Sequence, residues 1–265
     1  VHRRDLLLSN PLIPGNALRQ ALQQGASETL AIIRQSGLRG RGGAGFDTGK
    51  KWQFCREAPG NAHYVVCNAD EGEPGTFKDR YLLREYADAL FEGMTLSAFV
   101  IGAQQGFVYL RGEYRYLLPH LQAELNHRRK LGLLGANILG QAGFDFDIEV
   151  VVGAGAYICG EESALIESLE GKPGIPRIRP PFPVTHGYWG QPTVVNNVET
   201  FIAAAQIALH GANWFKASGT AASAGSKLLS ISGDCQRPGI YEYPFGVTIR
   251  QVLNDCGAAD AQAVQ

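Results

Sequence analysis

The stretch of this sequence that constrains the fold most is Gly37-Leu-Arg-Gly-Arg-Gly-Gly-Ala-Gly-Phe-Asp-Thr-Gly-Lys-Lys-Trp52, which has six glycines within residues 37–49. Positions 40, 42 and 45 spell the dinucleotide fingerprint G-x-G-x-x-G, but that fingerprint follows a strand, and here a predicted helix over 18–35 precedes it. A Walker-type phosphate loop is excluded too, because Lys50 is followed by Lys51 rather than Ser or Thr. Glycine backbone can nevertheless approach an anion closely. We therefore expect a non-standard phosphate-binding loop, with a flexible surface loop as the alternative.

Outward from this loop, predicted strands alternate with predicted helices, which favours an α/β layer. The expected strands are 63–67, 107–110 and 146–152. The expected helices are 80–104, 115–129 (started or kinked at Pro119), one from about Glu161 to Gly171, and 196–210. Between Lys172 and Pro192 six prolines argue against any regular element and favour a functional loop. A strand from Lys227 and a short helix from Val247 predict the start of a second, small α+β domain.

An acidic segment, Asn68-Ala-Asp70-Glu71-Gly72-Glu73, follows the first expected strand. Three carboxylates within four residues repel one another unless they are solvated, paired or used. Ligands bind beyond the carboxyl ends of strands in open α/β sheets, where such groups can accept hydrogen bonds from ribose or ribityl hydroxyls. A solvated acidic turn and a magnesium or calcium site are the alternatives, although the spacing matches no EF-hand loop.

Two later segments also join small residues to charged or polar ones. The first contains Tyr157, Gly160, Glu161 and Glu162, whose acids could equally stabilise a helix start. Its Cys159 is expected to be a buried structural thiol rather than a nucleophile. The second runs from Arg179 and Phe182, suited to hold a phosphate and stack on a ring, to Asn196-Asn197, one of which is expected to be a helix N-cap.

The composition excludes several classes of protein. In 265 residues, 24 Lys plus Arg balance 25 Asp plus Glu, so the net charge of −1 argues against a nucleic-acid binder. The longest apolar stretch, Leu90 to Ala103, is too short for a membrane helix. Five scattered cysteines give no metal or disulfide framework, so a reduced, cytoplasmic location is the default. The 33 glycines exceed the roughly 19 of average usage, which indicates tight turns or backbone close to a ligand.

Taken together, the four segments resemble the flavin-binding (51-kDa type) subunit of NADH dehydrogenases, over about Gly37 to Tyr241. Further segments, including Phe144-Asp-Phe-Asp147 and Leu229-Ser-Ile-Ser-Gly-Asp-Cys235, look more like the diaphorase flavin subunit of cytoplasmic NAD-reducing nickel-iron hydrogenases. The resemblance implies a Rossmann-like but non-standard FMN-binding α/β domain at residues 36–222. A helical lead-in (residues 1–35) precedes it, and the start of a ubiquitin-like (β-grasp, SLBB-type) α+β domain (residues 223–265) follows it.

The same resemblance implies which residues hold the cofactors. The residues expected to bind FMN are Gly40, Arg41, Gly42, Gly43, Lys51, Asn68, Asp70, Glu71, Tyr157, Gly160, Glu161, Asn196, Asn197 and Thr200. For NADH, the rings of Phe46, Phe54 and Phe182 are expected to stack on adenine, with Glu73 and Glu162 as polar partners and Arg179 where relatives often have Lys. Asp47 stands where many relatives have Pro.

The implied activity is hydride transfer between the nicotinamide and the flavin, followed by release of single electrons to iron-sulfur clusters. No side chain is expected to act as a catalytic acid or base; Glu73 and Glu162 have supporting roles, and no metal ligands are expected. Relatives carry a four-iron cluster on a C-x-x-C-x-x-C motif that is absent from this sequence. The expected partners are therefore iron-sulfur subunits and a hydrogenase-type module in a hetero-oligomer, without nucleic acid or membrane insertion. The alternatives are a subunit of complex I or of an NAD-dependent formate dehydrogenase, and a flavin-free nucleotide-binding scaffold.

Overall fold

A four-stranded parallel sheet organises the chain in the computed structural model, which describes residues 1–264. The strand order is β3-β2-β1-β4, with bounds β1 Tyr64–Ala69, β2 Gln105–Leu110, β3 Asp147–Val152 and β4 Thr193–Asn197. All three neighbouring pairs are parallel. The chain adds strands in one direction from β1 to β3 and then crosses to the other side of β1, which creates a topological switch point between β1 and β4. The predicted α/β class is confirmed.

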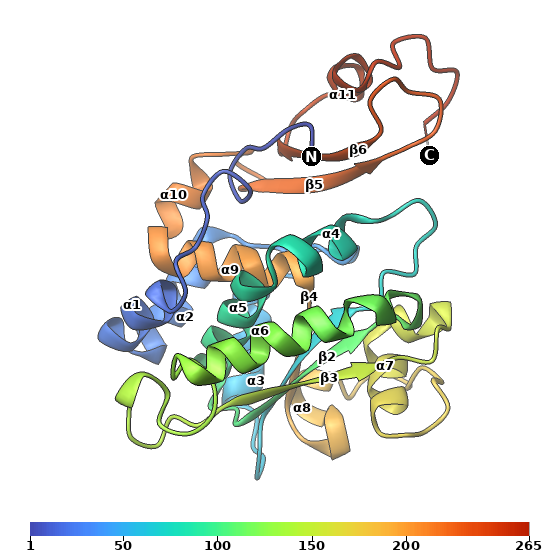
Figure 1. Cartoon of the computed structure of the whole chain (residues 1–265). Coiled ribbons are helices and arrows are strands. Elements are labelled where there is room, and N and C mark those ends of the chain that lie inside the picture. Colours follow the sequence, from blue (N-terminus) through green and yellow to red (C-terminus); the bar gives the residue numbers. More distant parts are fainter. Residues whose placement is uncertain (265) are drawn as a thin grey trace.

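Helices cover both faces of this sheet (Figure 1). On one face, α5 (Ala87–Ile101) and α9 (Val198–His210) pack with α1 (Asn16–Gln24) and α2 (Ala26–Ser36) against Val65 and Cys67 of β1. On the other face, Val66 of β1 packs with Leu165 and Ile166 of α7 (Glu162–Leu169). Because β1 is buried on both sides, its side chains alternate between two cores.

Helices α5 and α9 cross closely at a glycine. A Cβ atom on Gly93 of α5 would lie 2.0 Å from the backbone carbonyl oxygen of Phe201 in α9, so only glycine fits there. Helix α9 directly follows β4, and its placement against α5 therefore fixes the carboxyl end of β4.

Several predicted elements differ from the observed ones. The helix expected over 18–35 is two helices that break at Gly25, which has φ of 87°. The helix expected over 80–104 divides into α4 (Lys78–Glu85) and α5. The expectation that residues 196–210 form one helix was wrong at its start, since Asn196 and Asn197 end β4, whose apolar part is only Val194-Val195. Helix α3 (Thr48–Glu57) was not predicted.

The proline-rich segment was expected to lack regular elements, yet it forms a short helix, α8 (Pro183–His186), and the 3-10 turn η4 (Tyr188–Gly190). Pro183 occupies the first turn of α8, where the missing N–H costs no hydrogen bond. The other short turns are η1 (Gly112–Leu117), which leads into α6 (Leu118–Lys130), η2 (Ile138–Gly140) and η3 (Tyr157–Gly160).

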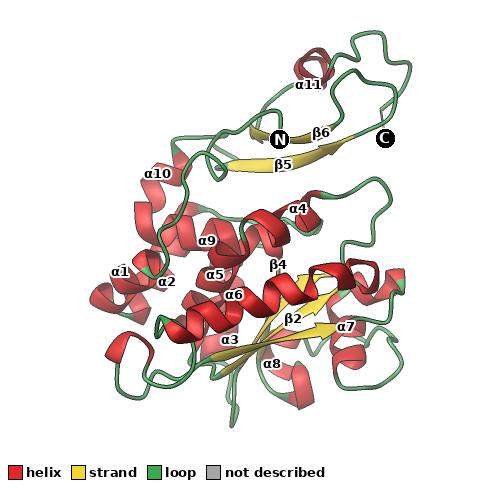
Figure 2. Ribbon diagram, viewed as in Figure 1, coloured by secondary structure: helices red, strands yellow, loops and turns green. Residues whose placement is uncertain are grey.

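A second, two-stranded sheet follows α10 (Ala212–Lys216). Strands β5 (Ser226–Ile231) and β6 (Gly239–Pro244) are antiparallel, and α11 (Ile249–Cys256) covers them with its own small core. Figure 2 shows this layer above the helices of the larger sheet, with the N-terminal segment running beside it. Arg3 forms a parallel bridge to Tyr241, so the first residues pack on the second sheet. The boundaries of the domains stay a prediction.

Candidate functional site

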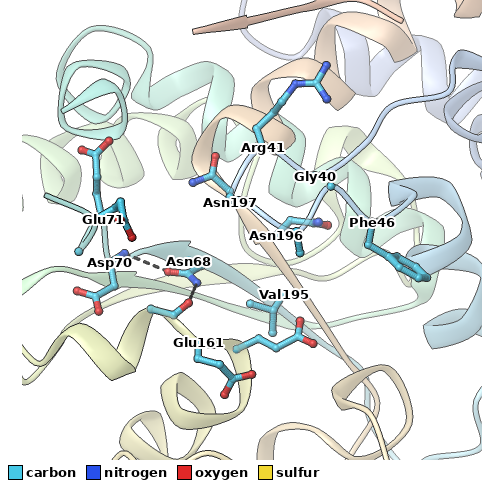
Figure 3. Close-up of a pocket in the computed structure, with 18 of the residues that line it drawn as sticks. Gly40, Arg41, Phe46, Asn68, Asp70, Glu71, Glu161, Val195, Asn196 and Asn197 are labelled. Atoms are coloured by element: carbon cyan, nitrogen blue, oxygen red, sulfur yellow. Dashed lines mark hydrogen bonds between the residues drawn. The ribbon is translucent and has the colours of Figure 1, made fainter. Parts of the chain in front are cut away.

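A cavity of about 1030 Å³ opens at the carboxyl ends of β1 and β4, at the switch point of the sheet. Its walls come from the glycine loop, the acidic segment after β1, the segment η3–α7, the proline-rich segment and the end of β4. Figure 3 shows residues of the glycine loop, the acidic segment, η3–α7 and the end of β4 around this cavity. Of the predicted site residues, all but Thr200 line it: Gly40, Arg41, Gly42, Gly43, Phe46, Lys51, Phe54, Asn68, Asp70, Glu71, Glu73, Tyr157, Gly160, Glu161, Glu162, Arg179, Phe182, Asn196 and Asn197.

Parallel pairing brings the asparagines at the ends of β1 and β4 together at the floor of the cavity. Asn68 of β1 lies in register with Asn197 of β4, and Asn196 lies opposite Cys67. The Asn68 side-chain amide donates to the backbone oxygen of Gly160 over 2.7 Å, and its oxygen accepts from the Asp70 N–H (Figure 3). Asn68 thereby joins β1 to η3.

The two neighbouring asparagines of β4 have separate structural tasks. The Asn197 side chain accepts from the N–H of Glu199 and caps α9, as predicted for one of the pair. The Asn196 side chain instead accepts from the indole N–H of Trp52, which is fully buried in α3. Together they fix α9 and α3 against the cavity floor.

The glycine loop closes on itself beside this floor. The Gly40 N–H donates to the carbonyl of Phe46 over 2.9 Å, and the Arg41 N–H donates to the hydroxyl of Thr200. A Cβ on Gly42 would lie 3.3 Å from the Cβ of Asn197, so the loop backbone packs directly on β4. Thr200 is buried behind the loop rather than in the cavity wall, and it acts on the site through Arg41.

Asp47 immediately precedes the next helix, α3. Its side chain accepts from the N–H of Lys50 over 2.8 Å and caps α3. The glycine loop therefore leads into a capped helix that carries Lys51, Trp52 and Phe54.

The three clustered carboxylates have three different environments. Asp70 is 8% exposed, and one of its side-chain oxygens is buried without a hydrogen-bond partner among the described residues. Burial raises the pKa of Asp70 to about 6. Glu71 accepts from the N–H groups of Asp79 and Arg80 and from the Tyr114 hydroxyl, so it caps α4. Glu73 is exposed and accepts from the hydroxyl of Tyr157 over 2.7 Å.

Charges of both signs face each other across the cavity. The Lys51 ammonium lies 3.0 Å from a carboxylate oxygen of Glu162 and also donates to the carbonyl of Val195. The Arg179 guanidinium lies 3.3 Å from both Glu161 and Glu162. The other oxygen of Glu161 caps α7 by accepting from the N–H groups of Ser163 and Ala164. Both helix-start acids thus have a capping or pairing role as well as a place in the wall.

Three phenylalanine rings stand at the cavity with about half of their surface exposed: Phe46 50%, Phe54 48% and Phe182 51%. Exposed aromatic rings are costly in water and well suited to stack on a flat heterocycle. They come from the glycine loop, α3 and the proline-rich segment, respectively.

The sequence reasoning missed Lys78 and Asp79, which also line the cavity. The Lys78 ammonium lies 2.7 Å from Asp79 and 3.0 Å from Glu199, and it donates to the side-chain oxygen of Asn197. Although burial alone would lower it, these carboxylates raise the pKa of Lys78. In the sequence the pair is indistinguishable from an ordinary solvated helix start, because Glu199 and Asn197 are distant in the chain.

Metal-binding clusters and membrane-spanning helices are both absent from the described part of the chain. Within residues 1–264, no group of three or more His, Cys, Asp or Glu side chains is arranged to hold a metal ion. No helix in that range is long and apolar enough to span a membrane. Cys159 is buried in the small core behind η3, as expected for a structural thiol.

The cavity fits a flavin nucleotide on the chain's own geometry. The buried Asp70 oxygen has no hydrogen-bond donor among the described residues, and the Glu161 oxygen that faces Arg179 makes only that 3.3 Å ion pair, so both can accept from hydroxyl groups. Backbone N–H groups of the glycine loop can bind an anion such as a phosphate, and the half-exposed rings can stack on a flat heterocycle.

Comparison with known proteins gives consistent matches. Residues 33–206 match the family described as the Nuo51 FMN-binding domain. The NAD-reducing hydrogenase HoxS subunit alpha of Cupriavidus necator is 58% identical over 248 residues, which cover 94% of this chain and 41% of that protein. The F subunit of the NADH-quinone oxidoreductase of Aquifex aeolicus is 50% identical over 237 residues, which cover 89% of this chain and 55% of that protein.

Among solved structures, that of an NAD+-reducing NiFe-hydrogenase in the H2-reduced state superimposes with a TM-score of 0.89 at 50% identity. The match covers 97% of this chain and 44% of the hydrogenase chain. The chain thus spans about half the length of the relatives that it matches, or less.

Proposed function

Because the chain belongs to the Nuo51 FMN-binding domain family, we propose that it forms the flavin- and NADH-binding part of an NAD(H)-dependent oxidoreductase. The observation that carries the proposal is the cavity at the switch point, where the glycine-loop backbone, the unpartnered Asp70 oxygen and half-exposed rings meet. A flavin-free scaffold would have no need to bury the Asp70 oxygen without a donor, since such burial costs stability.

The inner part of the cavity is proposed to hold FMN. Asp70 and Glu161 would accept hydrogen bonds from its hydroxyl groups, and the glycine loop would carry its phosphate. The complete proposed set is Gly40, Arg41, Gly42, Gly43, Lys51, Asn68, Asp70, Glu71, Tyr157, Gly160, Glu161, Asn196, Asn197 and Thr200, with Glu71, Thr200 and the Arg41 side chain acting by supporting the walls.

The outer part is proposed to hold NADH. Phe46, Phe54 and Phe182 would stack on its adenine, while Glu73, Glu162 and Arg179 would provide polar contacts. Arg179 is half-exposed and already paired with Glu161 and Glu162, so it is placed to exchange these partners for a nucleotide phosphate.

Bound FMN supplies two-electron hydride exchange with NAD(H) and single-electron release. The chain's own residues would bind and orient the two nucleotides and shield them from solvent. The aromatic rings would hold the nicotinamide nucleotide, Lys51 and Glu162 would link two walls of the cavity, and Asn68, Asn197 and the buried Asn196 would form its floor. No side chain is assigned a proton-transfer step.

The complex is proposed to be an NAD-reducing hydrogenase, in which this chain is the flavin part of the diaphorase. The similarity to HoxS subunit alpha at 58% identity supports this choice. The same proposal includes a cytoplasmic location and a four-iron cluster in a further part of the subunit. It also includes two kinds of partner, iron-sulfur subunits and a hydrogenase-type module. The 50% identity to the F subunit of an NADH-quinone oxidoreductase supports complex I as the second candidate.

The first experiment is anaerobic reduction of the protein loaded with FMN. We expect NADH to bleach the flavin absorption and to support reduction of an artificial acceptor dye. Phe182→Ala should raise the KM for NADH, since stacking on a base contributes about 1–3 kcal/mol. Ile178→Ala in the same segment is the matched control, because Ile178 is 92% exposed and does not line the cavity. A protein that binds no FMN, or FMN that NADH does not bleach, contradicts the proposal.

The choice of complex needs a second experiment on the native assembly. Tagged protein isolated from its own cells should carry hydrogenase-type subunits and reduce NAD+ with hydrogen. Co-isolation with quinone-reducing membrane subunits instead would favour the complex I alternative.

A further inference from the structure

The Arg41 side chain leaves the cavity although its backbone lies in the glycine loop. Figure 3 shows the guanidinium directed away from Asn68, Asp70 and Glu161. Its Nε and Nη2 atoms donate to the carbonyl of Ser226 over 3.2 and 2.9 Å, and Nη2 also reaches the carbonyl of Ala224. Nη1 donates to the carbonyl of Arg39 over 2.5 Å. The guanidinium therefore donates only to backbone carbonyl oxygens. One of them belongs to Ser226 of β5 and another to Ala224, just before that strand.

Two aromatic rings complete the socket for this guanidinium. Its central carbon lies 4.8 Å from the ring centre of Phe245 and 6.0 Å from that of Phe215. Gly225, between the two carbonyls, has φ of 80°, and a Cβ there would lie 2.1 Å from the Phe215 ring. We call these residues (Phe215, Ala224, Gly225, Ser226, Phe245) the Arg41 socket. The planar guanidinium group of arginine can donate to these carbonyl groups and lie against the rings at the same time. The ammonium group of a lysine cannot make the same set of contacts.

Strand β5 also contacts two segments that lie next to the cavity. The Leu228 N–H donates to the Glu199 carboxylate in the first turn of α9 over 2.9 Å. The Ser230 hydroxyl accepts over 2.9 Å from the N–H of Phe77, the residue that precedes α4. Ser226 and Leu228 are alternate residues of β5, so the backbone groups that they use lie at the same edge of the strand.

The strand itself is anchored from behind. The Ser226 hydroxyl donates to Glu242 of β6, and the same buried carboxylate accepts from four successive backbone N–H groups, those of residues 5–8. Glu242 thus ties β5, β6 and the N-terminal segment into one unit. The position of Arg41 is set by this unit, outside the larger sheet.

We propose that the second sheet is a positioning element of the flavin cavity and that Arg41 is its positioning residue, which clamps the glycine loop to β5. The proposal rests on the proposed function, because it assigns a role in binding FMN. It differs from the role expected from resemblance, in which Arg41 would contact the flavin phosphate directly.

The test compares FMN with riboflavin, which lacks the phosphate, on the whole protein. In Arg41→Lys and Phe245→Leu, a clamp predicts that the Kd values for both flavins rise by the same factor, roughly tenfold, because the loop is misplaced for either ligand. Phe245 does not line the flavin cavity, so its variant cannot act through a phosphate contact. A Kd that rises for FMN and not for riboflavin in Arg41→Lys would overturn the proposal.

Amide hydrogen exchange gives a readout that needs no flavin. Both variants should speed exchange at residues 40–43 while the core of β1 and α5 keeps its protection. Ser230→Ala is the matched control on the same strand, since it should speed exchange at Phe77 and leave the glycine loop unchanged. Arg56→Gln controls for the loss of a surface arginine. Unchanged protection of residues 40–43 in Arg41→Lys and Phe245→Leu would refute the clamp.

The two proposals can therefore fail separately. If the wild-type protein binds neither flavin, the proposed function fails, and exchange at residues 40–43 alone decides whether Arg41 clamps the loop. If the wild-type protein binds FMN and the variants bind both flavins as tightly as it does, the proposed function stands and the clamp is refuted.

Discussion

Lys51 and Glu162 form a 3.0 Å ion pair between the helix that follows the glycine loop and the helix that follows η3. In the proposed site, this pair neutralises a carboxylate that would otherwise disfavour negative charge on a reduced flavin.

Glu162→Gln is expected to raise the midpoint potential of the bound flavin, because one negative charge near it is removed. Lys51→Met should lower it for the opposite reason. The expected shifts are on the order of 30 mV, which corresponds to about 1.4 kcal/mol for a two-electron couple. Anaerobic redox titration measures them, with the exposed Glu113→Gln, outside the cavity, as control. An unchanged potential in Glu162→Gln would show that its carboxylate does not act on the flavin.

Because of Asp70, we expect the stability of the flavin-free protein to fall with rising pH and the affinity for FMN to increase. Burial raises its pKa to about 6 from an ordinary value of 3.8, so the folded protein holds the proton more tightly than the unfolded chain. The resulting stabilisation is full below about pH 4 and is lost as the pH rises through 6. Urea unfolding of the flavin-free protein should therefore show this loss in the wild type and not in Asp70→Asn.

Flavin binding should show the reverse trend. Hydroxyl donors favour the ionised carboxylate, so FMN affinity should increase as the pH rises through about 6. Fluorescence titration at several pH values measures it. An affinity with the same pH profile in the wild type and in Asp70→Asn would show that Asp70 accepts no hydrogen bond from the ligand.

Asp47→Ala removes the side-chain cap of α3. We expect a loss of about 1 kcal/mol in the free energy of unfolding, while Asp47→Asn, which keeps the acceptor, should lose only a few tenths. Chemical denaturation of the two variants measures the difference. If Ala and Asn are equivalent at this position, the cap does not stabilise the helix.

Gly93→Ala should be strongly destabilising, because the added methyl group would lie 2.0 Å from the Phe201 carbonyl. Overpacking of this kind costs about 1–3 kcal/mol, or more where backbone must move. Ser97→Ala, one turn further along α5, is the matched control. The Ser97 hydroxyl is buried without a hydrogen-bond partner among the described residues, so its removal should leave the melting temperature unchanged or raise it. Equal melting temperatures for Gly93→Ala and the wild type would contradict the close helix crossing.

The sequence predicted the first three strands well, because each is a run of apolar residues between polar or glycine-rich segments. It did not predict β4, in which only Val194 and Val195 are apolar and the last two residues are asparagines. Helix α3 was missed because Gly49, Lys50 and Lys51 in its first turns read as a continuation of the glycine loop. In both cases tertiary pairing, with β1 or with α5, overrides a weak local signal.

The sequence singled out residues that line one cavity in the structure, whereas the contacts of each side chain could not be predicted. Glu71 and Glu73 are two positions apart, yet one caps α4 and the other is exposed beside Tyr157. The direction of the Arg41 side chain depends on carbonyl groups about 185 positions away in the chain. Local patterns carry no information about such partners.

The strand order also sets the order of events when the protein is made. Strands β1, β2 and β3 are synthesised before β4, which carries its asparagines to the opposite side of β1. The strand that holds Arg41 comes later still, at Ser226. If Arg41 clamps the glycine loop as proposed, the cofactor site is complete only once synthesis has passed β5.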